Sequence, residues 1–344
     1  MKTFVTFGEI MLRLSPPDML RLGQARSFNV TYGGGEINVA VSLSNFGLQS
    51  EFVTRLPDND IGQAALQYIQ QYNVGTHHSL RGGERMGIYF LECGAAMRGS
   101  QVIYDRAQSS FASIAPGMVD WKTVFGNAHW FHWTGITPAI SAGAAAVCLE
   151  GVKAAREMGI TISCDMNFRA KLWKWGKSAG EVMHELVSLC DVAIGNEEDA
   201  EKVFGIKAPE TDVITGQMNA KQYQHVCDEL GKMFPNLKKI AITLRGSLSA
   251  SHNTWSGILW NQGKFSQGPT YDITPIVDRV GGGDSFMAGL LYGLSQFNEN
   301  DQKTINFAVA ASALKHTIVG DFNLVSINEV EKLISGDASG RVTR

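Results

Sequence analysis

Short apolar runs alternate with longer amphipathic stretches along most of this chain. Residues 3–7 form the first apolar run, and residues 36–47 follow with helical spacing that ends at Gly47, a residue typical of helix C-termini. The same pattern predicts strands at 49–55, 160–165, 192–195 and 239–244, and helices at 62–72, 141–158, 179–190, 197–204, 284–297 and 304–318. Helices that alternate with short buried strands are typical of a mostly parallel sheet covered on both faces.

Two stretches break this alternation. Residues 13–33 contain two adjacent prolines, and residues 86–106 contain two extended runs around a glycine-rich turn. We interpret both as an antiparallel β flap inserted into an α/β domain. The predicted organisation is an α/β core of residues 1–12, 34–85 and 107–344, and a β lid of residues 13–33 and 86–106.

Composition and charge exclude several classes of protein. A chain of 344 residues with 44% hydrophobic and 18% charged residues is not disordered, and a net charge of −3 argues against a nucleic-acid binder. The five cysteines form no CxxC pair, so free thiols in a reducing cytosol are expected. The uncharged run 123–149 contains Pro138 and several polar residues, which predicts two elements joined by a loop rather than a membrane span. We therefore expect a cytoplasmic protein.

The strongest chemical signal is a glycine loop before an apolar helix. Gly281, Gly282 and Gly283 leave backbone N–H groups uncovered at the positive end of the helix, which together favour a bound anion. Asp284 follows directly, where a carboxylate can accept a proton from a hydroxyl while the loop holds a phosphoryl group. The alternative is a glycine loop in which Asp284 only caps the helix.

Residues 278–284 resemble the D-x-x-G-A-G-D signature of the ribokinase-like (PfkB) carbohydrate kinases, with Gly282 where the family usually has Ala. That family's N-terminal signature, a glycine pair followed by N-x-A, is similar to residues 33–40, where the matching residues include Gly34, Gly35 and Asn38. The resemblance covers essentially the whole chain. It implies a three-layer α/β/α sandwich with a small β-sheet lid, and a kinase that uses ATP and Mg²⁺.

The resemblance also implies roles for single residues. Asp284 would accept the proton of a sugar hydroxyl, while the amides of the glycine loop would stabilise the transferring phosphoryl group. Asn196 and Asp199 match the family's N-x-x-E, which organises Mg²⁺ and the ATP phosphates, although an acidic first helical turn explains Glu197 and Glu198 equally well. Residues expected at the nucleotide are Asn167, Asn196, Arg245, Gly246, Gly281 and Gly283, with helix 306–316 over the adenine.

Within the family, the chain looks most like the branch of 2-keto-3-deoxygluconate kinases. Gly8-Glu9 and Gly34-Gly35-Glu36 resemble that branch. Tyr104 and Arg106 lie two apart on an extended run and so face one side, which Tyr89 on the neighbouring run can share. Residues expected at the sugar are Gly34, Gly35, Asn38, Tyr89, Tyr104, Arg106, Arg169 and Asp321.

Two guanidinium groups, those of Arg106 and Arg169, suggest a substrate carboxylate. Arg169 alone is weak evidence because fructokinases often carry the same D-x-N-x-R, Arg106 can equally be a solvated flap residue, and Asp321 can equally belong to a helix-ending turn. The resulting hypothesis is ATP-dependent phosphorylation of the C6 hydroxyl of 2-keto-3-deoxygluconate.

Other functions stay open at this point. They are a kinase of a neutral sugar or nucleoside, a non-catalytic sugar-sensing relative, and a nicotinamide oxidoreductase, for which the N-terminal fingerprint is lacking. An exposed flap edge can pair with a second subunit, so we expect a homo-oligomer through the lid. We expect no membrane or nucleic-acid partner.

Overall fold

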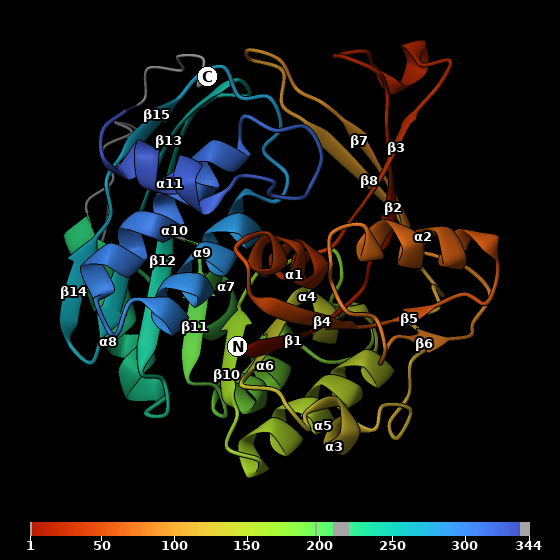
Figure 1. The fold of residues 1–344 in the computed structure, drawn as a ribbon, viewed down its shortest axis with the longest axis horizontal. Helices are drawn as coiled ribbons and strands as arrows, with labels where there is room; N and C mark the ends of the chain where they lie inside the picture. Colours follow the sequence, from red (N-terminus) through yellow and green to blue (C-terminus); the bar gives the residue numbers. More distant parts are fainter. Residues whose placement is uncertain (1, 197, 209–219, 338–344) are drawn as a thin grey trace.

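A nine-stranded sheet forms the centre of the computed structural model, which describes residues 2–196, 198–208 and 220–337 (Figure 1). Its strands are β1 (Thr3–Phe7), β4 (Gln49–Val53), β9 (Trp130–Thr134), β10 (Thr161–Asp165), β11 (Val192–Gly195), β12 (Lys239–Ser249), β13 (His252–Asn261), β14 (Lys264–Gln267) and β15 (Tyr271–Ile273). The order is β14-β13-β12-β11-β10-β9-β1-β4, with β15 also on β13. Within this sheet, β4, β1, β9, β10, β11 and β12 pair in parallel, each with the next. Strands β13, β14 and β15 add an antiparallel edge. This confirms the predicted mostly parallel sheet.

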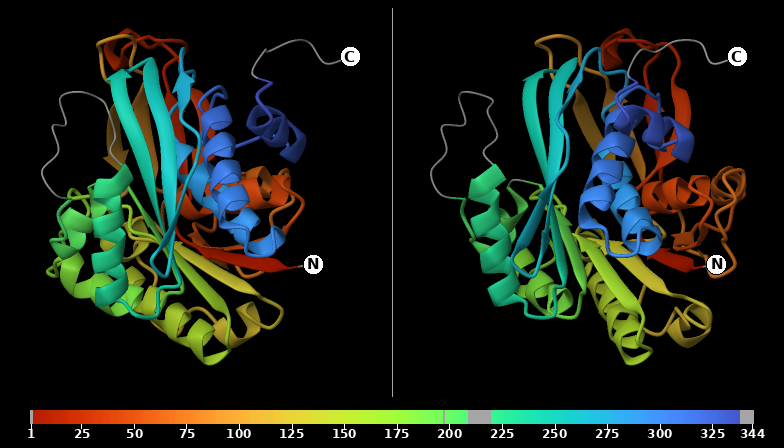
Figure 2. Two further views of the ribbon diagram at one scale, coloured as in Figure 1. Left: turned by 90° about the vertical axis from the view of Figure 1, so that its left-hand side faces the viewer. Right: turned by 60° about the vertical axis from the view of Figure 1, so that its left-hand side comes forward.

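Helices cover both faces of the sheet (Figure 2). They are α1 (Gly35–Asn45), α2 (Asp60–Gln70), α3 (Trp121–Val124), α4 (Ile136–Ile140), α5 (Ala142–Glu157), α6 (Ala179–Val187), α7 (Asp199–Phe204), α8 (Ala220–Met233), α9 (Gly282–Gln296), α10 (Asp301–Lys315) and α11 (Ile327–Ile334). Phe4 and Trp130 pack in one core with α1, α9, α10 and α11, whereas Val5 and Phe131 pack in the other with α3, α5, α6 and α8. Neighbouring strand residues thus face opposite cores, and the three-layer sandwich is confirmed.

Local signals explain where several elements begin and end. The Ser141 side chain accepts a hydrogen bond from the Ala144 amide and so caps α5. Gly159 follows α5 with φ at +71°, and Gly47 follows α1 with φ at +77°, conformations that favour glycine. The helix predicted at 197–204 begins at Asp199, and Glu197 lies outside the described residues.

The lid is a separate four-stranded sheet. Its strands are β2 (Met11–Ser15), β3 (Asn29–Gly33), β7 (Ile88–Glu92) and β8 (Gln101–Asp105), in the order β3-β2-β7-β8, with a short 3₁₀ helix η1 at Leu22–Gln24. The prediction of an antiparallel flap is wrong at its centre, because β2 and β7 pair in parallel. Two antiparallel hairpins from distant parts of the chain dock here through strands that run the same way. A minor sheet joins β5 (Arg55–Leu56) to β6 (Leu80–Arg81).

The uncharged run 123–149 is divided among several elements. It includes β9, α4 and the first turns of α5, and Pro138 lies within α4. Throughout the described ranges, each helix falls short of the length or hydropathy that crossing a bilayer requires.

Candidate active site

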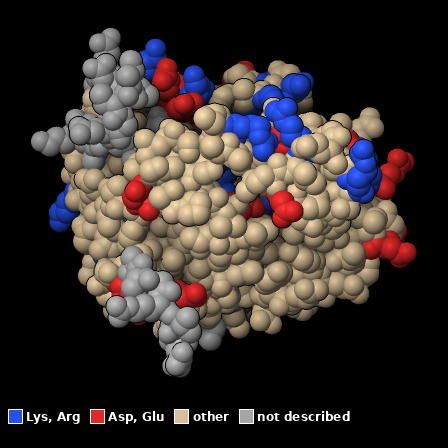
Figure 3. All heavy atoms as spheres, turned by 90° about the horizontal axis from the view of Figure 1, so that it is seen from above, with Lys and Arg blue, Asp and Glu red and all other residues tan. Residues whose placement is uncertain are grey.

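A cavity of about 410 Å³ lies between the C-terminal ends of the parallel strands and the lid. Seen from above, the surface at this end of the sheet is hollowed, and basic side chains gather near the hollow (Figure 3). The predicted site residues that line the cavity are Gly34, Gly35, Asn38, Tyr89, Tyr104, Asn167, Arg169, Asn196, Asp199, Arg245, Gly281, Gly282, Gly283, Asp284 and Asp321. Arg106 and Gly246 are the two predicted residues that are not among its lining residues.

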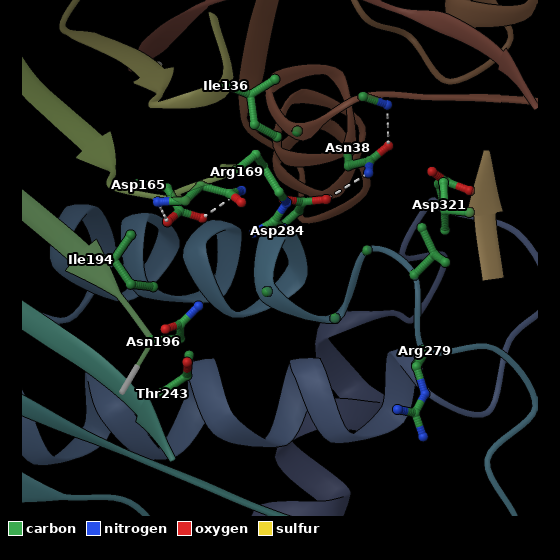
Figure 4. Close-up of a pocket in the computed structure, with 18 of the residues that line it drawn as sticks. Asn38, Ile136, Asp165, Arg169, Ile194, Asn196, Thr243, Arg279, Asp284 and Asp321 are labelled. Carbon is green, nitrogen blue, oxygen red and sulfur yellow. Dashed lines mark hydrogen bonds between the residues drawn. The ribbon is translucent and has the colours of Figure 1, made fainter. Parts of the chain in front are cut away.

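Asp284 lies in the first turn of α9 and points into the cavity (Figure 4). The Asn38 side chain, from α1, donates a hydrogen bond from Nδ2 to Asp284 Oδ2 at 2.6 Å, and Asn38 Oδ1 accepts one from the Gly34 amide at 3.3 Å. Burial raises the pKa of Asp284 to about 7, although the bond from Asn38 acts in the opposite direction. A carboxyl group with a pKa near neutrality is suited to accepting a proton.

The glycine loop needs glycine at its first position. Gly281 is the N-cap of α9 with φ at +82°, and a Cβ atom there would lie 2.0 Å from the carbonyl oxygen of Asp321. The first amides of a helix have no partner within it. Because Gly281, Gly282 and Gly283 line the cavity, the start of α9 is placed to hold an anion.

The two N-terminal motifs, Gly8-Glu9 and Gly34-Gly35-Glu36, lie against each other in the structure. A Cβ atom at Gly8 would lie 2.0 Å from the Glu36 carboxylate, and one at Gly34 would lie 2.1 Å from the Glu9 carbonyl oxygen. Glu36 accepts hydrogen bonds from the Thr134 amide at 3.0 Å and from two threonine hydroxyls, those of Thr134 and Thr137. Glu36 therefore joins the start of α1 to the end of β9, beside the cavity.

Sequence reasoning missed a buried network that links the lid to the glycine loop. Arg13, on lid strand β2, forms ion pairs of 2.5 Å with Asp278 and 2.7 Å with Asp321, and all three side chains are almost fully buried. Tyr89 donates a hydrogen bond to Asp321 at 2.5 Å, so both Asp321 oxygens have protein partners. Tyr89 and Asp321 were predicted at the sugar and Asp278 opens the C-terminal signature, but nothing in the sequence pointed to Arg13 as their partner.

Arg106 lies beside Tyr104 but is bound to another carboxylate. Tyr89 and Tyr104 are direct partners across β7 and β8, and the Arg106 guanidinium lies 5.6 Å from the centre of the Tyr104 ring. Its Nε donates to Glu9 Oε2 at 2.8 Å, its Nη2 also contacts that oxygen, and the residue is 7% exposed. The tyrosines share a face as expected, whereas the charge of Arg106 is neutralised by Glu9.

Arg169 and Asp165 come from the segment that follows β10. Arg169 is exposed and lines the cavity, between Asp165 and Asp284 in Figure 4. Burial raises the pKa of Asp165 well above its ordinary value, as do the charges of Asp199 and Asp284, and the charge of Arg169 opposes them. Asp165 was not predicted as a site residue, although it opens the same D-x-N-x-R motif.

Asn196 and Asp199 shape the loop between β11 and α7. The Asp199 carboxylate accepts hydrogen bonds from the amides of Asn196 at 2.8 Å and Phe168 at 3.0 Å. Asn196 Oδ1 accepts from the Glu198 amide at 2.8 Å. Within the described ranges, no group of three or more His, Cys, Asp or Glu side chains is arranged to hold a metal by itself.

Two further arginines, Arg245 and Arg279, line the cavity with Arg169. Arg245 lies on β12, and Arg279 donates to the carbonyl oxygens of Ser249 at 3.2 Å and Ala250 at 2.8 Å. Burial lowers the pKa of Arg279, and the nearby charge of Arg245 lowers it further. Two like charges held together in a cavity indicate an anionic ligand. Arg279 was missed because it occupies a variable position of the signature.

Comparisons with known proteins agree with this geometry. The model of the pfkB family carbohydrate kinases matches residues 1–324. The crystal structure of 2-dehydro-3-deoxygluconokinase from Thermotoga maritima is similar with 46% identity and a TM-score of 0.92, covering 98% of this chain and 100% of that one. A 2-dehydro-3-deoxygalactonokinase of Haloferax volcanii is 31% identical over 98% of each chain. A 2-dehydro-3-deoxygluconokinase of Bacillus subtilis is 26% identical over 84% of this chain and 82% of that one.

Proposed function

The chain belongs to the pfkB family of carbohydrate kinases, and from that premise we propose that it phosphorylates the C6 hydroxyl of 2-keto-3-deoxygluconate with ATP. This acid is the 2-dehydro-3-deoxygluconate of the relatives' names, and the products are 2-keto-3-deoxy-6-phosphogluconate and ADP. One observation carries the proposal. Asp284, held by Asn38, lies at the glycine loop in a cavity that also contains Arg169.

Proton removal falls to Asp284. Its Oδ2 is bound by Asn38, which leaves Oδ1 for the sugar hydroxyl. The pKa of about 7 lets the carboxylate accept the proton as the sugar oxygen attacks the γ-phosphorus of ATP and the bond from that phosphorus to ADP breaks. The carboxylate returns the proton to solvent afterwards. The amides of Gly281 to Gly283 stabilise the charge on the phosphoryl group, so that catalysis is mainly positioning and electrostatics.

The phosphate chain of ATP would meet Arg245 and Arg279, whose guanidinium groups suit phosphate oxygens. Asn196 and Asp199, with Asp165 nearby, would hold Mg²⁺ through its bound waters, because this ion keeps several waters and takes only one or two protein carboxylates. When bound, Mg²⁺ would neutralise charge on the phosphates. The predicted cover of the adenine by residues 306–316 stays a prediction.

The substrate carboxylate has two candidate partners. Arg169 lies in the cavity with its guanidinium free of any ion pair among the described residues, so we assign it the direct contact. Arg106 does not line the cavity and its Nε and Nη2 bind Glu9, so we propose for it a weaker contribution than that of Arg169, through its remaining Nη1. Tyr89 and Tyr104 enclose the sugar from the same lid face.

A second candidate substrate is 2-keto-3-deoxygalactonate, which is favoured by the 31% identical relative from Haloferax volcanii. The two acids differ only in configuration at C4. Both fit a cavity with a cation for the carboxylate and a base at the far hydroxyl.

A coupled ADP-release assay with both keto-deoxy acids, gluconate, fructose and ribose tests the proposal. We expect the highest kcat/KM with 2-keto-3-deoxygluconate. A higher value with the galactonate epimer would change the substrate within the class. A preference for fructose or ribose would overturn the sugar-acid assignment, and no turnover with any sugar would overturn the kinase proposal.

A further inference from the structure

The last turns of α10 lie directly behind the glycine loop. Ser312, Lys315 and His316 are spaced i, i+3 and i+4, so they share one face of the helix. Ser312 Oγ donates a hydrogen bond to the Gly282 carbonyl oxygen at 2.7 Å. The His316 carbonyl oxygen accepts from the amides of Val277 at 2.8 Å and Asp278 at 3.2 Å. This face of α10 therefore holds the loop on the side away from the cavity.

Lys315 is unusual on this face because it is a fully buried lysine, with 0% of its surface exposed. Its Nζ donates to the carbonyl oxygens of Asp278 and Ile318, each at 3.2 Å. Among the described residues, no carboxylate lies within ion-pair distance of its ammonium group. Lysine is almost never fully buried without an ionic partner, since burying its charge is costly. A specific role must offset that cost.

The surroundings of Lys315 indicate what the role is. Burial lowers its pKa, while the charges of Asp278, Asp321 and Asp284 act in the opposite direction and favour the ammonium form. Asp278 is itself fixed from the lid side by Arg13. Asp278, which leads into the glycine loop, is thus held at its carboxylate by the Arg13 guanidinium group and at its carbonyl oxygen by the Lys315 ammonium group.

We propose that Lys315 is a positioning residue for phosphoryl transfer, whose ammonium group fixes the glycine loop from behind and adds positive potential where the transferring phosphoryl group lies. The second half of this proposal, the positive potential at the phosphoryl group, rests on the proposed kinase function. Its first half, the fixing of the loop, does not depend on the substrate. A purely structural alternative is that Lys315 only satisfies carbonyl groups at the C-terminal end of α10.

The test compares Lys315→Met and Lys315→Gln with wild type and with Lys303→Met. Lys303 lies on the same helix, with its ammonium group 4.2 Å from the centre of the Phe297 ring, and makes a matched control. Removal of one donor at an oxyanion site costs about 10²- to 10³-fold in kcat. Because Lys315 acts through the loop, we expect a fall of roughly 10- to 100-fold, with KM for the sugar changed less than about threefold. The control should keep wild-type kcat.

Two further measurements separate positioning from simple helix capping. Hydrogen exchange at the amides of residues 279–284 should be faster in Lys315→Met than in wild type or Lys303→Met. Millimolar ammonium or methylammonium should restore part of kcat in a third variant, Lys315→Ala, because the shorter side chain leaves a space that the cation can enter, and it should not affect the control. Lys315→Gln keeps a donor without the charge, so it should protect the loop better than Met while kcat stays low.

A purely structural role of Lys315 would give different results. If both variants lose thermal stability equally while kcat below the unfolding temperature stays within about twofold of wild type, Lys315 only caps the helix. If wild type phosphorylates no sugar, the proposed function fails, yet hydrogen exchange and ATP affinity still decide whether Lys315 fixes the loop. Unchanged exchange in both variants would overturn the proposal whatever the activity.

Discussion

Single charged side chains in this protein owe their behaviour to partners far away in the sequence. Asp284 is buried and receives a hydrogen bond from Asn38, which lies on another helix. Arg106 is neutralised by Glu9, and Arg13 by Asp278 and Asp321. Residue types in a motif therefore predict which groups are present, while their charge and reach depend on contacts that a local motif does not contain.

Replacing Asp284 by Asn should reduce activity and raise stability at the same time. Loss of a general base lowers kcat by about 10²- to 10⁴-fold. The pKa of Asp284 in the folded protein is about 7, above its ordinary value of 3.8. The protonated carboxyl group therefore contributes its full stabilisation below pH 3.8, and this contribution is lost as pH rises through about 7. Asp284→Asn should therefore melt higher than wild type at pH 8, by a difference that narrows as pH falls toward 4. Calorimetry across this range, with the ADP-release assay, measures both effects. A variant that keeps a tenth of wild-type kcat would exclude Asp284 as the base.

Replacing Arg169 by Ala should harm acid substrates selectively. A hydrogen bond to a charged group contributes about 1.5–3 kcal/mol, or roughly 10- to 150-fold in kcat/KM. We expect that loss with 2-keto-3-deoxygluconate and little change in any residual activity with fructose. For Arg106, the suitable variant is the pair Arg106→Met with Glu9→Gln, since the single change leaves the buried Glu9 carboxylate without its cation. Equal losses on acid and neutral sugars would show that neither arginine recognises the carboxylate.

Elements with clear local signals could be predicted from the sequence, and elements defined by distant pairing could not. Gly47, Gly159 and Ser141 mark helix ends, and the glycine loop marked the start of α9. The strands β13 and β14 were not predicted. The apolar run of β12 ends at Leu244, but β12 continues beyond it because it pairs with β13, and this pairing is not visible in the local pattern. The parallel pairing of β2 with β7 was also unpredictable, because it joins two hairpins separated by α1, β4, β5, α2 and β6.

The departure from the family signature at Gly282 has a cause in α10. A Cβ atom at Gly282 would lie 2.8 Å from Cε1 of the buried His316 ring. Gly282→Ala, which restores the usual family residue, should therefore destabilise this chain by about 1–3 kcal/mol through overpacking. Adding His316→Ala should relieve the crowding and recover stability relative to the sum of the two single changes. Additive effects in a double-mutant cycle of urea unfolding would contradict this explanation.

We expect the buried ion pairs of Arg13 to be the main noncovalent interaction that holds the lid to the core. Arg13→Met would leave Asp278 and Asp321 buried without their cation, and breaking a buried ion pair in this way costs about 3–5 kcal/mol. We expect a loss of that size in urea unfolding and faster hydrogen exchange in β2. Arg21→Met is the control, because Arg21 lies on the lid with 61% of its side chain exposed and should change stability by less than about 0.5 kcal/mol. Equal effects of the two changes would show that the buried pairs do not hold the lid.

At the scale of the whole molecule, the lid presents two different faces. Arg13, Tyr89 and Tyr104 share a cross-strand row on the cavity side. The next row carries Val30, Leu14, Phe90 and Ile103, which are direct partners across β3, β2, β7 and β8. Because side chains alternate along a strand, this apolar row lies on the outer side, and its ends, Val30 and Ile103, are 56% and 51% exposed. An exposed apolar row on an open sheet favours a partner.

The proposed partner is a second copy of this chain, joined through the outer face of the lid. We expect wild type to be a homo-oligomer by light scattering at micromolar concentration, because pairing through this face would bury the row of Val30 and Ile103. Val30→Lys with Ile103→Lys should give a monomer, since two charges would be buried in the interface. Met118→Lys is the control, because Met118 is 42% exposed and lies outside the lid, so its mass should equal that of wild type. A wild type that is monomeric at these concentrations would contradict the prediction. An unchanged mass of the Val30→Lys, Ile103→Lys variant would also contradict it, because any interface would then lie elsewhere and the apolar row would be open to solvent.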